Sequence, residues 1–322
     1  MNHKWIAVLL AAALAALPGC ARESRPSSAP EAPSCQSEPV SSEPEAPSSS
    51  SSTADETQVL PQTADEAAER FVAALRAGDT GEMEFLSARY ESPSGQCDYW
   101  KQVALGEISC EPIQSEGISG TYRLTMEVLD AGPTLLATGV GSYVMRVGSL
   151  GYDPIPMVLC IAPEDRYIDE MQLIEDSAAA QVMQARAFGF LSRPFETPDD
   201  LTDDLDVEYL IAMGASEYPD GLTQGQMDEM AARYYGAEEF VRQESRFYDP
   251  QTQLYVMLGR GGNITNDRIV RIDHGADETF LYVETYTDPV QVCLERTFEY
   301  HMKDNGDGTW QVITLREVEP LA

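Results

Sequence analysis

The order of helix-like and strand-like segments constrains the fold of this chain more than any other feature. Two successive stretches, starting at Thr63 and near Asp206, each place helical patterns first and strand patterns afterwards. Helices that are segregated from strands in this way pack on one face of an antiparallel sheet. We therefore expect an α+β protein with two tandem domains, at residues 63–176 and 201–322, joined by a connecting segment at 177–200.

The helices are predicted from capping signals and from apolar periodicity. Thr63 and Glu66 match a capping box, apolar residues then recur at helical spacing, and Gly78 stands where the helix ends. Thr223 and Gln226 give the same signal in the second stretch, where Gly236 marks the end. Further helical pieces are expected at residues 81–88, 98–105, 178–190, 206–213 and 238–246.

The strands are predicted from alternation of apolar and polar residues. In the stretch 290–302 apolar residues alternate with polar ones, which indicates one buried and one wetter face. The glycine-rich and aspartate-rich segment 303–308 that follows is typical of a hairpin loop. Strands are expected at residues 121–129, 134–147, 156–161, 167–174, 254–258, 268–273, 279–287, 290–302 and 309–318.

The N-terminus carries the clearest targeting signal. Lys4 precedes an apolar run that ends at Pro18, which is the length of a secretory signal peptide and too short to span a bilayer of ~30 Å comfortably. Leu17-Pro18-Gly19-Cys20 resembles the lipobox of bacterial lipoproteins, although Pro18 departs from the usual pattern. The resemblance implies cleavage between Gly19 and Cys20 and acylation of the Cys20 thiol. The alternatives are a plain signal peptide and an uncleaved anchor.

Residues 20–62 are expected to form a lipidated, disordered stalk. The segment is rich in Ser, Pro and Glu and almost free of large apolar residues, so it cannot bury enough surface to offset its ordering entropy. Two acyl chains on Cys20 would hold the protein to the membrane, because each buried methylene contributes ~0.8 kcal/mol. The expected location is the extracytoplasmic face of the cell membrane, with membrane lipid as a partner.

The layout of helices before an antiparallel meander resembles that of the cystatin-like and nuclear-transport-factor-2-like domains. Surface lipoproteins of Gram-positive bacteria often carry such domains, and the segments 221–223, 231–236 and 248–250, with Phe240 and Tyr255, are similar to theirs. The resemblance implies helices packed against a curved sheet in each domain. It implies no catalytic residue, because the family has no universal one.

Charge excludes some partners. The chain has 21 Lys and Arg against 54 Asp and Glu, which gives a formal net charge of −33. A protein that tracks nucleic-acid phosphates needs a basic surface, so nucleic acid is not an expected partner. Docking onto anionic lipid through charge is disfavoured for the same reason.

The cysteines suggest one disulfide. An exported protein can form disulfides, and Cys97 and Cys110 lie close together in one expected domain, so a bridge between them is possible. The alternative is that each is a small apolar core residue. Cys160 and Cys293 belong to strands of different halves, and Cys35 lies in the expected stalk. No C-x-x-C motif is present, so no redox or zinc motif is indicated.

Weaker candidates for chemistry are scattered along the chain. His301 could share a strand face with Glu295 and Glu299, but same-face side chains stand ~6.5–7 Å apart, which is awkward for one metal ion. The aspartates of segment 199–206 do not fit the calcium-loop pattern and suit a helix N-terminus instead. His274 and the glycine-rich segment 259–263 are typical of hairpin loops. No metal site or cofactor is predicted.

Three functional hypotheses remain. The first is a non-catalytic binding module of the cell envelope, displayed on a lipid-anchored stalk, whose ligand is an envelope protein, a peptide or a small molecule. The second is an enzyme with an acid–base pocket in one sheet, which would need a buried carboxylate beside a tyrosine in a sealed pocket. The third is a cation-responsive envelope protein. We prefer the first because the sequence holds an anchor signal but no catalytic motif.

Overall fold

The structure is a computed structural model that describes residues 59–87, 97–149, 154–257 and 266–321. These residues form six α-helices, two four-stranded antiparallel sheets and one two-stranded sheet. The expected α+β fold class is therefore confirmed. The expected signal peptide, with Gly19 and Cys20, and nearly all of the expected stalk lie outside the described residues.

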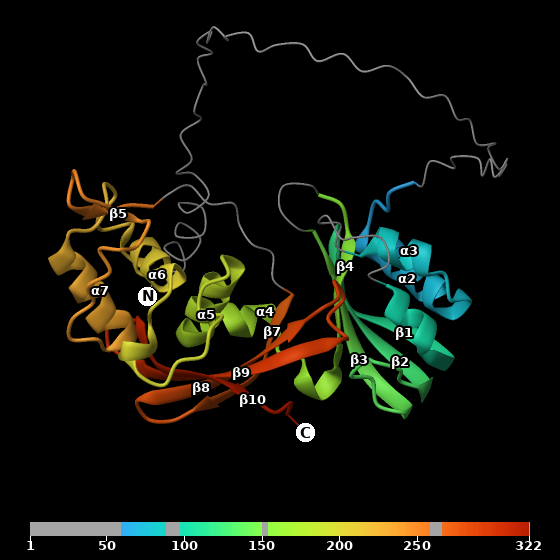
Figure 1. The fold of residues 1–322 in the computed structure, drawn as a ribbon. Helices are drawn as coiled ribbons and strands as arrows, with labels where there is room; N and C mark the ends of the chain where they lie inside the picture. Colours follow the sequence, from blue (N-terminus) through green and yellow to red (C-terminus); the bar gives the residue numbers. More distant parts are fainter. Residues whose placement is uncertain (1–58, 88–96, 150–153, 258–265, 322) are drawn as a thin grey trace, which may run out of the picture. The chain divides into compact units, whose positions relative to one another are not determined.

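The first half, residues 59–166, contains one sheet, a helix that packs on it and a second, shorter helix beside the first (Figure 1). The strands follow one another as an antiparallel meander in the order β1-β2-β3-β4. Its elements are α2 (Ala64–Ala77), α3 (Thr80–Leu86), the 3₁₀ turn η1 (Asp98–Gln102), β1 (Ala104–Glu116), β2 (Ser119–Asp130), β3 (Gly139–Gly148), β4 (Met157–Pro163) and η2 (Glu164–Arg166).

The first helix forms where the capping signals place it. The Thr63 side chain accepts a hydrogen bond from the Glu66 backbone N–H, and Gly78 ends the helix in the left-handed conformation at φ +65°. Phe71 and Leu75 on the inner face are buried against the sheet. Helix α2 thus fixes the first core on one face of β1–β4.

The second half, residues 167–321, repeats this order with more helices (Figure 1). Its sheet has the order β10-β9-β8-β7, again antiparallel throughout, and α5 and α7 contact it. Its elements are α4 (Glu170–Glu175), α5 (Ser177–Ala187), η3 (Pro198–Asp200), α6 (Asp204–Gly214), α7 (Gln224–Tyr235), β5 (Tyr248–Asp249), β6 (Leu254–Tyr255), β7 (Asp267–His274), β8 (Glu278–Tyr286), β9 (Leu294–Asp304) and β10 (Trp310–Val318).

The β8–β9 loop, residues 287–293, belongs to the second half but packs into the first core. Val290 and Val292 are 0% and 2% exposed and lie in the cluster built by α2 and β1–β4. The Val290 carbonyl accepts a hydrogen bond from Ile161 N–H at 2.9 Å, and the Val292 carbonyl accepts one from Leu135 N–H at 2.8 Å. The first core is therefore completed by a segment that the second half supplies.

Asp288 holds this loop in shape. Its carboxylate, 1% exposed, accepts hydrogen bonds from the backbone N–H groups of Val290, Val292 and Cys293. Gln291 takes the left-handed conformation at φ +60° to complete the turn. Residues 290–293, expected at the start of a strand, therefore form a turn, and β9 begins at Leu294.

Two strand predictions were wrong for identifiable reasons. Strand β1 was missed because its side chains are nearly all exposed and only Ile108 is buried, so no alternation appears in the sequence. Its pairing with β2 is a backbone interaction at the edge of the sheet. The expected strand at 167–174 contains instead the short helix α4, whose N-terminus Asp169 caps by accepting from Met171 N–H.

Of two further helical expectations, one is confirmed and one needs correction. The helix expected at 178–190 forms as α5, and the stretch 177–200, expected as a connecting segment, contributes Ala178, Val182 and Phe195 to the second core. The second core therefore begins before residue 201, because the alanine-rich face of α5 is small enough to pack closely. The stretch 238–246 forms no helix. There, Asp228 accepts from the Phe240 N–H and fixes an irregular backbone path.

Candidate functional site

A cavity of about 140 Å³ lies between elements of the two halves. It is lined by strands β3 and β4 from the first half and by α4, α5, β7, β8 and the β8–β9 loop from the second. Its walls are mixed, with apolar side chains interrupted by charged ones. The lining residues are Arg146, Leu159, Cys160, Tyr167, Ile168, Glu170, Leu173, Val182, Met183, Arg186, Asp267, Arg268, Ile269, Val283 and Gln291.

Arg268 is the most unusual group in this lining. It precedes Ile269 and Val270 on β7, and its side chain is only 8% exposed. Its Nη2 contacts the Glu284 carboxylate at 3.4 Å and donates to the Tyr286 hydroxyl. Its Nε and Nη1 have no hydrogen-bond partner among the described residues. Such buried, unpaired donors on a charged group are unfavourable by about 1–3 kcal/mol or more each.

Arg186, by contrast, is fully engaged. Its guanidinium forms two hydrogen bonds with the Asp267 carboxylate, at 2.8 and 2.6 Å, and donates to the Thr285 hydroxyl at 2.8 Å. Both partners of this ion pair are at least nine-tenths buried. The pair links α5 to β7, and both of its residues line the cavity.

The third arginine of the cavity comes from the first half. Arg146 on β3 pairs with Glu170 on α4, and both side chains are partly exposed. The cavity lining therefore carries three arginines against two carboxylates. In a chain of net charge −33 this excess of positive charge is a local exception, and it favours an anionic ligand.

A buried carboxylate beside a tyrosine occurs near this cavity, but it is already neutralised. Glu284 is 0% exposed and accepts a hydrogen bond from the Tyr286 hydroxyl. Arg166 and Arg268 each approach its carboxylate at 3.4 Å. Neither Glu284 nor Tyr286 lines the cavity. This arrangement stabilises charge within the protein and does not present an acid or base to a substrate.

The β8–β9 loop contributes to the cavity as well as to the first core. Gln291 lines the cavity, and its side-chain amide donates to the Asp267 carbonyl at 3.3 Å. The same loop buries Val290 and Val292 in the first core. The same short loop therefore contacts the cavity through Gln291 and the first core through Val290 and Val292.

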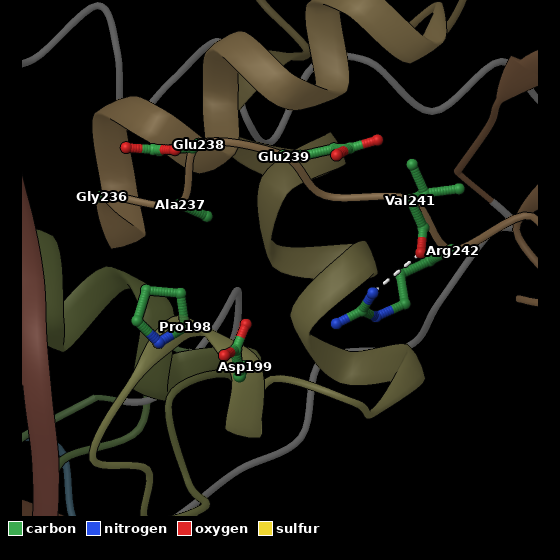
Figure 2. A pocket seen from close by; sticks show the side chains of 8 residues that line it. All are labelled: Pro198, Asp199, Gly236, Ala237, Glu238, Glu239, Val241 and Arg242. Atoms are coloured by element: carbon green, nitrogen blue, oxygen red, sulfur yellow. Dashed lines mark hydrogen bonds between the residues drawn. The ribbon is translucent and has the colours of Figure 1, made fainter.

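A larger and more open groove of about 520 Å³ lies beside the end of α7. Figure 2 shows Pro198 and Asp199 on one side of it, and Glu238, Glu239 and Arg242 on the segment that follows Gly236. In Figure 2 the side chains of Glu238 and Glu239 point in opposite directions. The groove is acidic on balance, and no buried group in it lacks a partner among the described residues.

Arg242 in this groove serves the protein itself. Its Nε and Nη2 donate to the Leu201 carbonyl at 3.1 and 2.6 Å, and its Nη1 donates to the Val241 carbonyl at 2.8 Å. The guanidinium therefore joins the segment after α7 to Leu201, which precedes α6, and these hydrogen bonds occupy its donors. We take the arginine-lined cavity, and not the acidic groove, as the candidate site.

The aspartates of segment 199–206 cap helices. Asp203 accepts from Leu205 N–H at the start of α6, and Asp206 accepts in return from Asp203 N–H. Asp200 accepts from the backbone N–H groups of Glu196 and Thr197, which lowers its pKa. Burial raises the pKa of Asp206 to about 6. The run is thus explained by local structure.

The two histidines within the described residues lie apart and contact different acidic partners. His301 Nε2 lies 2.9 Å from the Glu278 carboxylate on the neighbouring strand, and its ring stacks on Phe280 with centroids 4.4 Å apart. The structure therefore pairs His301 across strands with Glu278. His274 lies 3.1 Å from Asp176, the residue that caps α5.

Cys97 and Cys110, the possible disulfide, are both free thiols in the structure. They lie in different surroundings: Cys97 is buried near Tyr99, Asp288 and Cys293, whereas Cys110 is half-buried on β1. Burial raises the pKa of Cys97 to about 11 and that of Cys293 to about 12. Segment 259–263, the glycine-rich candidate, lies outside the described residues.

Many of the aromatic residues belong to the two cores. Tyr234, Tyr235, Phe247 and Tyr255 are all buried in the second core, and Tyr209 packs against both Tyr234 and Tyr235. Tyr99 and Trp100 belong to the first core. None of them lines the arginine-rich cavity.

Sequence reasoning missed the three arginines of the cavity. The signal that could have found them is a charged residue at an apolar position. Arg146 stands between Met145 and Val147 in a strand, and Arg186 lies on the alanine-rich inner face of α5. Such a charge needs a buried partner or a ligand.

Comparison with known proteins gives no further identification. No family model matches the chain, and no curated protein is significantly similar to it. Within the described ranges no helix has the length and apolar character needed to cross a membrane. The same residues contain no group of three or more His, Cys, Asp or Glu side chains placed to hold a metal ion.

Proposed function

We propose that the protein is a lipid-anchored, extracytoplasmic binding protein of the cell envelope that acts without catalysis. The observation that carries the binding role is the cavity between the two halves, with the unpaired donors of Arg268 in its lining. The resemblance of Leu17–Cys20 to a lipobox supports the anchor. Acylation of Cys20 would place the folded halves outside the membrane on a stalk of residues 20–62.

The chemistry of the cavity supports binding better than turnover. Asp267, the most buried carboxylate of its lining, is held in an ion pair by Arg186, and Glu170 is paired with Arg146. The Cys160 thiol is buried, and burial raises its pKa, so the reactive thiolate is disfavoured. These groups can orient and neutralise a ligand but supply no free acid, base or nucleophile.

The anchor is tested by replacing its cysteine. Cys20→Ala should abolish acylation and leave the protein unprocessed at Gly19, whereas Cys35→Ala, the matched control in the same segment, should change neither. The measurements are metabolic labelling with a fatty acid, intact mass, and partition between membrane and soluble fractions. The proposal fails if Cys20→Ala is labelled and membrane-bound as strongly as the wild type.

A further inference from the structure

We propose that the cavity binds a short aliphatic monocarboxylate, whose carboxylate is held by Arg268. This inference rests on the proposed binding function and names the ligand class of that site. Three observations carry it: the unpaired donors of a buried guanidinium, the excess of positive charge in the lining, and apolar walls around both.

The unpaired donors define the polar end of the ligand. Nε and Nη1 of Arg268 lack partners among the described residues, and the side chain is more than nine-tenths buried. An ionised carboxylate forms charge-assisted hydrogen bonds with a guanidinium, which are about twice as strong as neutral ones. Glu284 occupies only the Nη2 side of Arg268, so a second acceptor can be taken up without displacing it.

Charge balance limits the ligand to a single negative charge. Arg186 is neutralised by Asp267 and Arg146 by Glu170. Arg268 and Arg166 share one carboxylate, that of Glu284, which leaves one positive charge in excess. A dianion such as inorganic phosphate would bring one uncompensated charge into a partly buried site, which is unfavourable. A monoanion restores neutrality.

Size and wall chemistry define the rest of the ligand. The cavity volume of about 140 Å³ is close to the ~150 Å³ that accommodates benzene in an engineered apolar cavity. A ligand of about six non-hydrogen atoms therefore fits. Leu159, Ile269 and Val283 provide apolar walls, which favour an alkyl chain over a second polar group. Butyrate matches these requirements.

The experiment is titration calorimetry of the full-length chain in detergent with sodium butyrate, at ionic strength matched with sodium chloride. We expect one butyrate per chain. Butyramide, which has the same shape without the charge, and inorganic phosphate should each bind at least about ten-fold more weakly. Absence of butyrate binding, or equal binding of butyramide, would overturn the proposal. Tighter binding of phosphate would overturn the carboxylate assignment.

Three variants locate the site. Arg268→Gln should weaken butyrate binding at least about ten-fold. Because this change leaves Glu284 with one arginine fewer and can disturb folding, Met183→Trp provides a second test that fills the cavity and alters no charge. Arg123→Gln, an exposed arginine on β2 paired with Glu164, is the control and should bind as the wild type does. Unchanged affinity in Met183→Trp would place any binding elsewhere and refute the site.

These outcomes are separate from those of the anchor. If butyrate fails to bind while Cys20 is acylated, the ligand assignment is wrong and the lipoprotein proposal stands. If butyrate binds but Cys20 is not acylated, the ligand assignment stands and the lipoprotein proposal is wrong.

Discussion

The two halves of the molecule share a layout but differ in how they complete their cores. Each has a four-stranded antiparallel meander with helices packed against it. The second core is made entirely of residues between 173 and 315. The first core, in contrast, includes Val290, Val292 and Cys293 from the β8–β9 loop. The first half therefore depends on the second more than the second depends on the first.

This dependence has a physical origin in the number of helices. Among the described residues of the first half, α2 packs against the sheet and the short α3 adds Met83 and Leu86 to the same core, so part of the apolar surface of the sheet is left for another element to cover. The second half has α5, α6 and α7 in its core. Two halves with the same order of helices and strands therefore need not be two independent folding units. Two variants test this dependence directly, and three more, two at capping aspartates and one at a surface ion pair, set the scale against which it is judged, in order of expected effect.

Arg186→Met should have the largest effect and should destabilise both halves. It leaves the Asp267 carboxylate buried without its partner, which destabilises by about 3–5 kcal/mol. Because the second half holds the β8–β9 loop, the first half should loosen with it. Hydrogen exchange should show lost protection in β1–β4 as well as in β7–β10. Loss confined to β7–β10 would argue that the halves are independent.

Asp288→Ala, in contrast, should destabilise mainly the first half. Three backbone N–H groups lose their acceptor, and we expect a loss of about 2–4 kcal/mol in the free energy of unfolding. Hydrogen exchange should rise in β3, β4 and the loop, while α6 and α7 keep their protection. Equal loss in both halves would contradict the asymmetry.

Asp206→Asn should give a smaller effect that depends on pH. Burial raises the folded-state pKa of Asp206 to about 6, so its stabilising contribution is present below pH ~4 and is lost as the pH rises through about 6. Asparagine keeps an acceptor for Asp203 N–H without titrating. The variant should therefore gain about 1–2 kcal/mol relative to the wild type between pH 4 and pH 7, measured by denaturant unfolding.

Asp200→Asn is the matched control for this pH dependence. Hydrogen bonds from Thr197 and Glu196 N–H lower the pKa of Asp200, so its contribution is present above pH ~4 and lost as the pH falls. Relative to the wild type this variant should lose stability at neutral pH and recover it in acid. If both variants gained stability at neutral pH, or both lost it, burial of Asp206 would not be the cause of its pH-dependent effect on stability.

Arg316→Gln should have the smallest effect. Arg316 and Glu196 form an ion pair between half-exposed side chains, and such pairs contribute about 0–1 kcal/mol. Thermal unfolding should change little and should depend weakly on salt. A shift as large as that of Asp288→Ala would show that an exposed ion pair contributes as much stability as the buried hydrogen bonds of the β8–β9 loop, which would contradict this ranking.

The sequence predicted the elements that carry their own local signals. Helices α2 and α7 have capping residues at one end and a left-handed glycine at the other, and both were placed correctly. Strand β1 has no such signal, because its side chains are exposed and its hydrogen bonds are those of the backbone. The docking of the β8–β9 loop into the first core is a tertiary contact that no local pattern encodes.

The candidate site shows the same limit. Its three arginines are spread over more than 120 residues of sequence, from Arg146 to Arg268. In the sequence, each is an isolated charge with no neighbouring residue to indicate its partner. Their convergence follows from the packing of one half against the other. The anchor at Cys20 is the opposite case, since its whole signal is contiguous, and it stays a prediction.

The central claim is that the two halves together enclose one binding site. Hydrogen exchange of the full-length chain, with and without saturating butyrate, tests it most directly. We predict increased protection in β4 and α4 together with α5 and β7, because these elements line the cavity. Protection confined to one half, or located at residues 236–242 of the acidic groove, would contradict the claim.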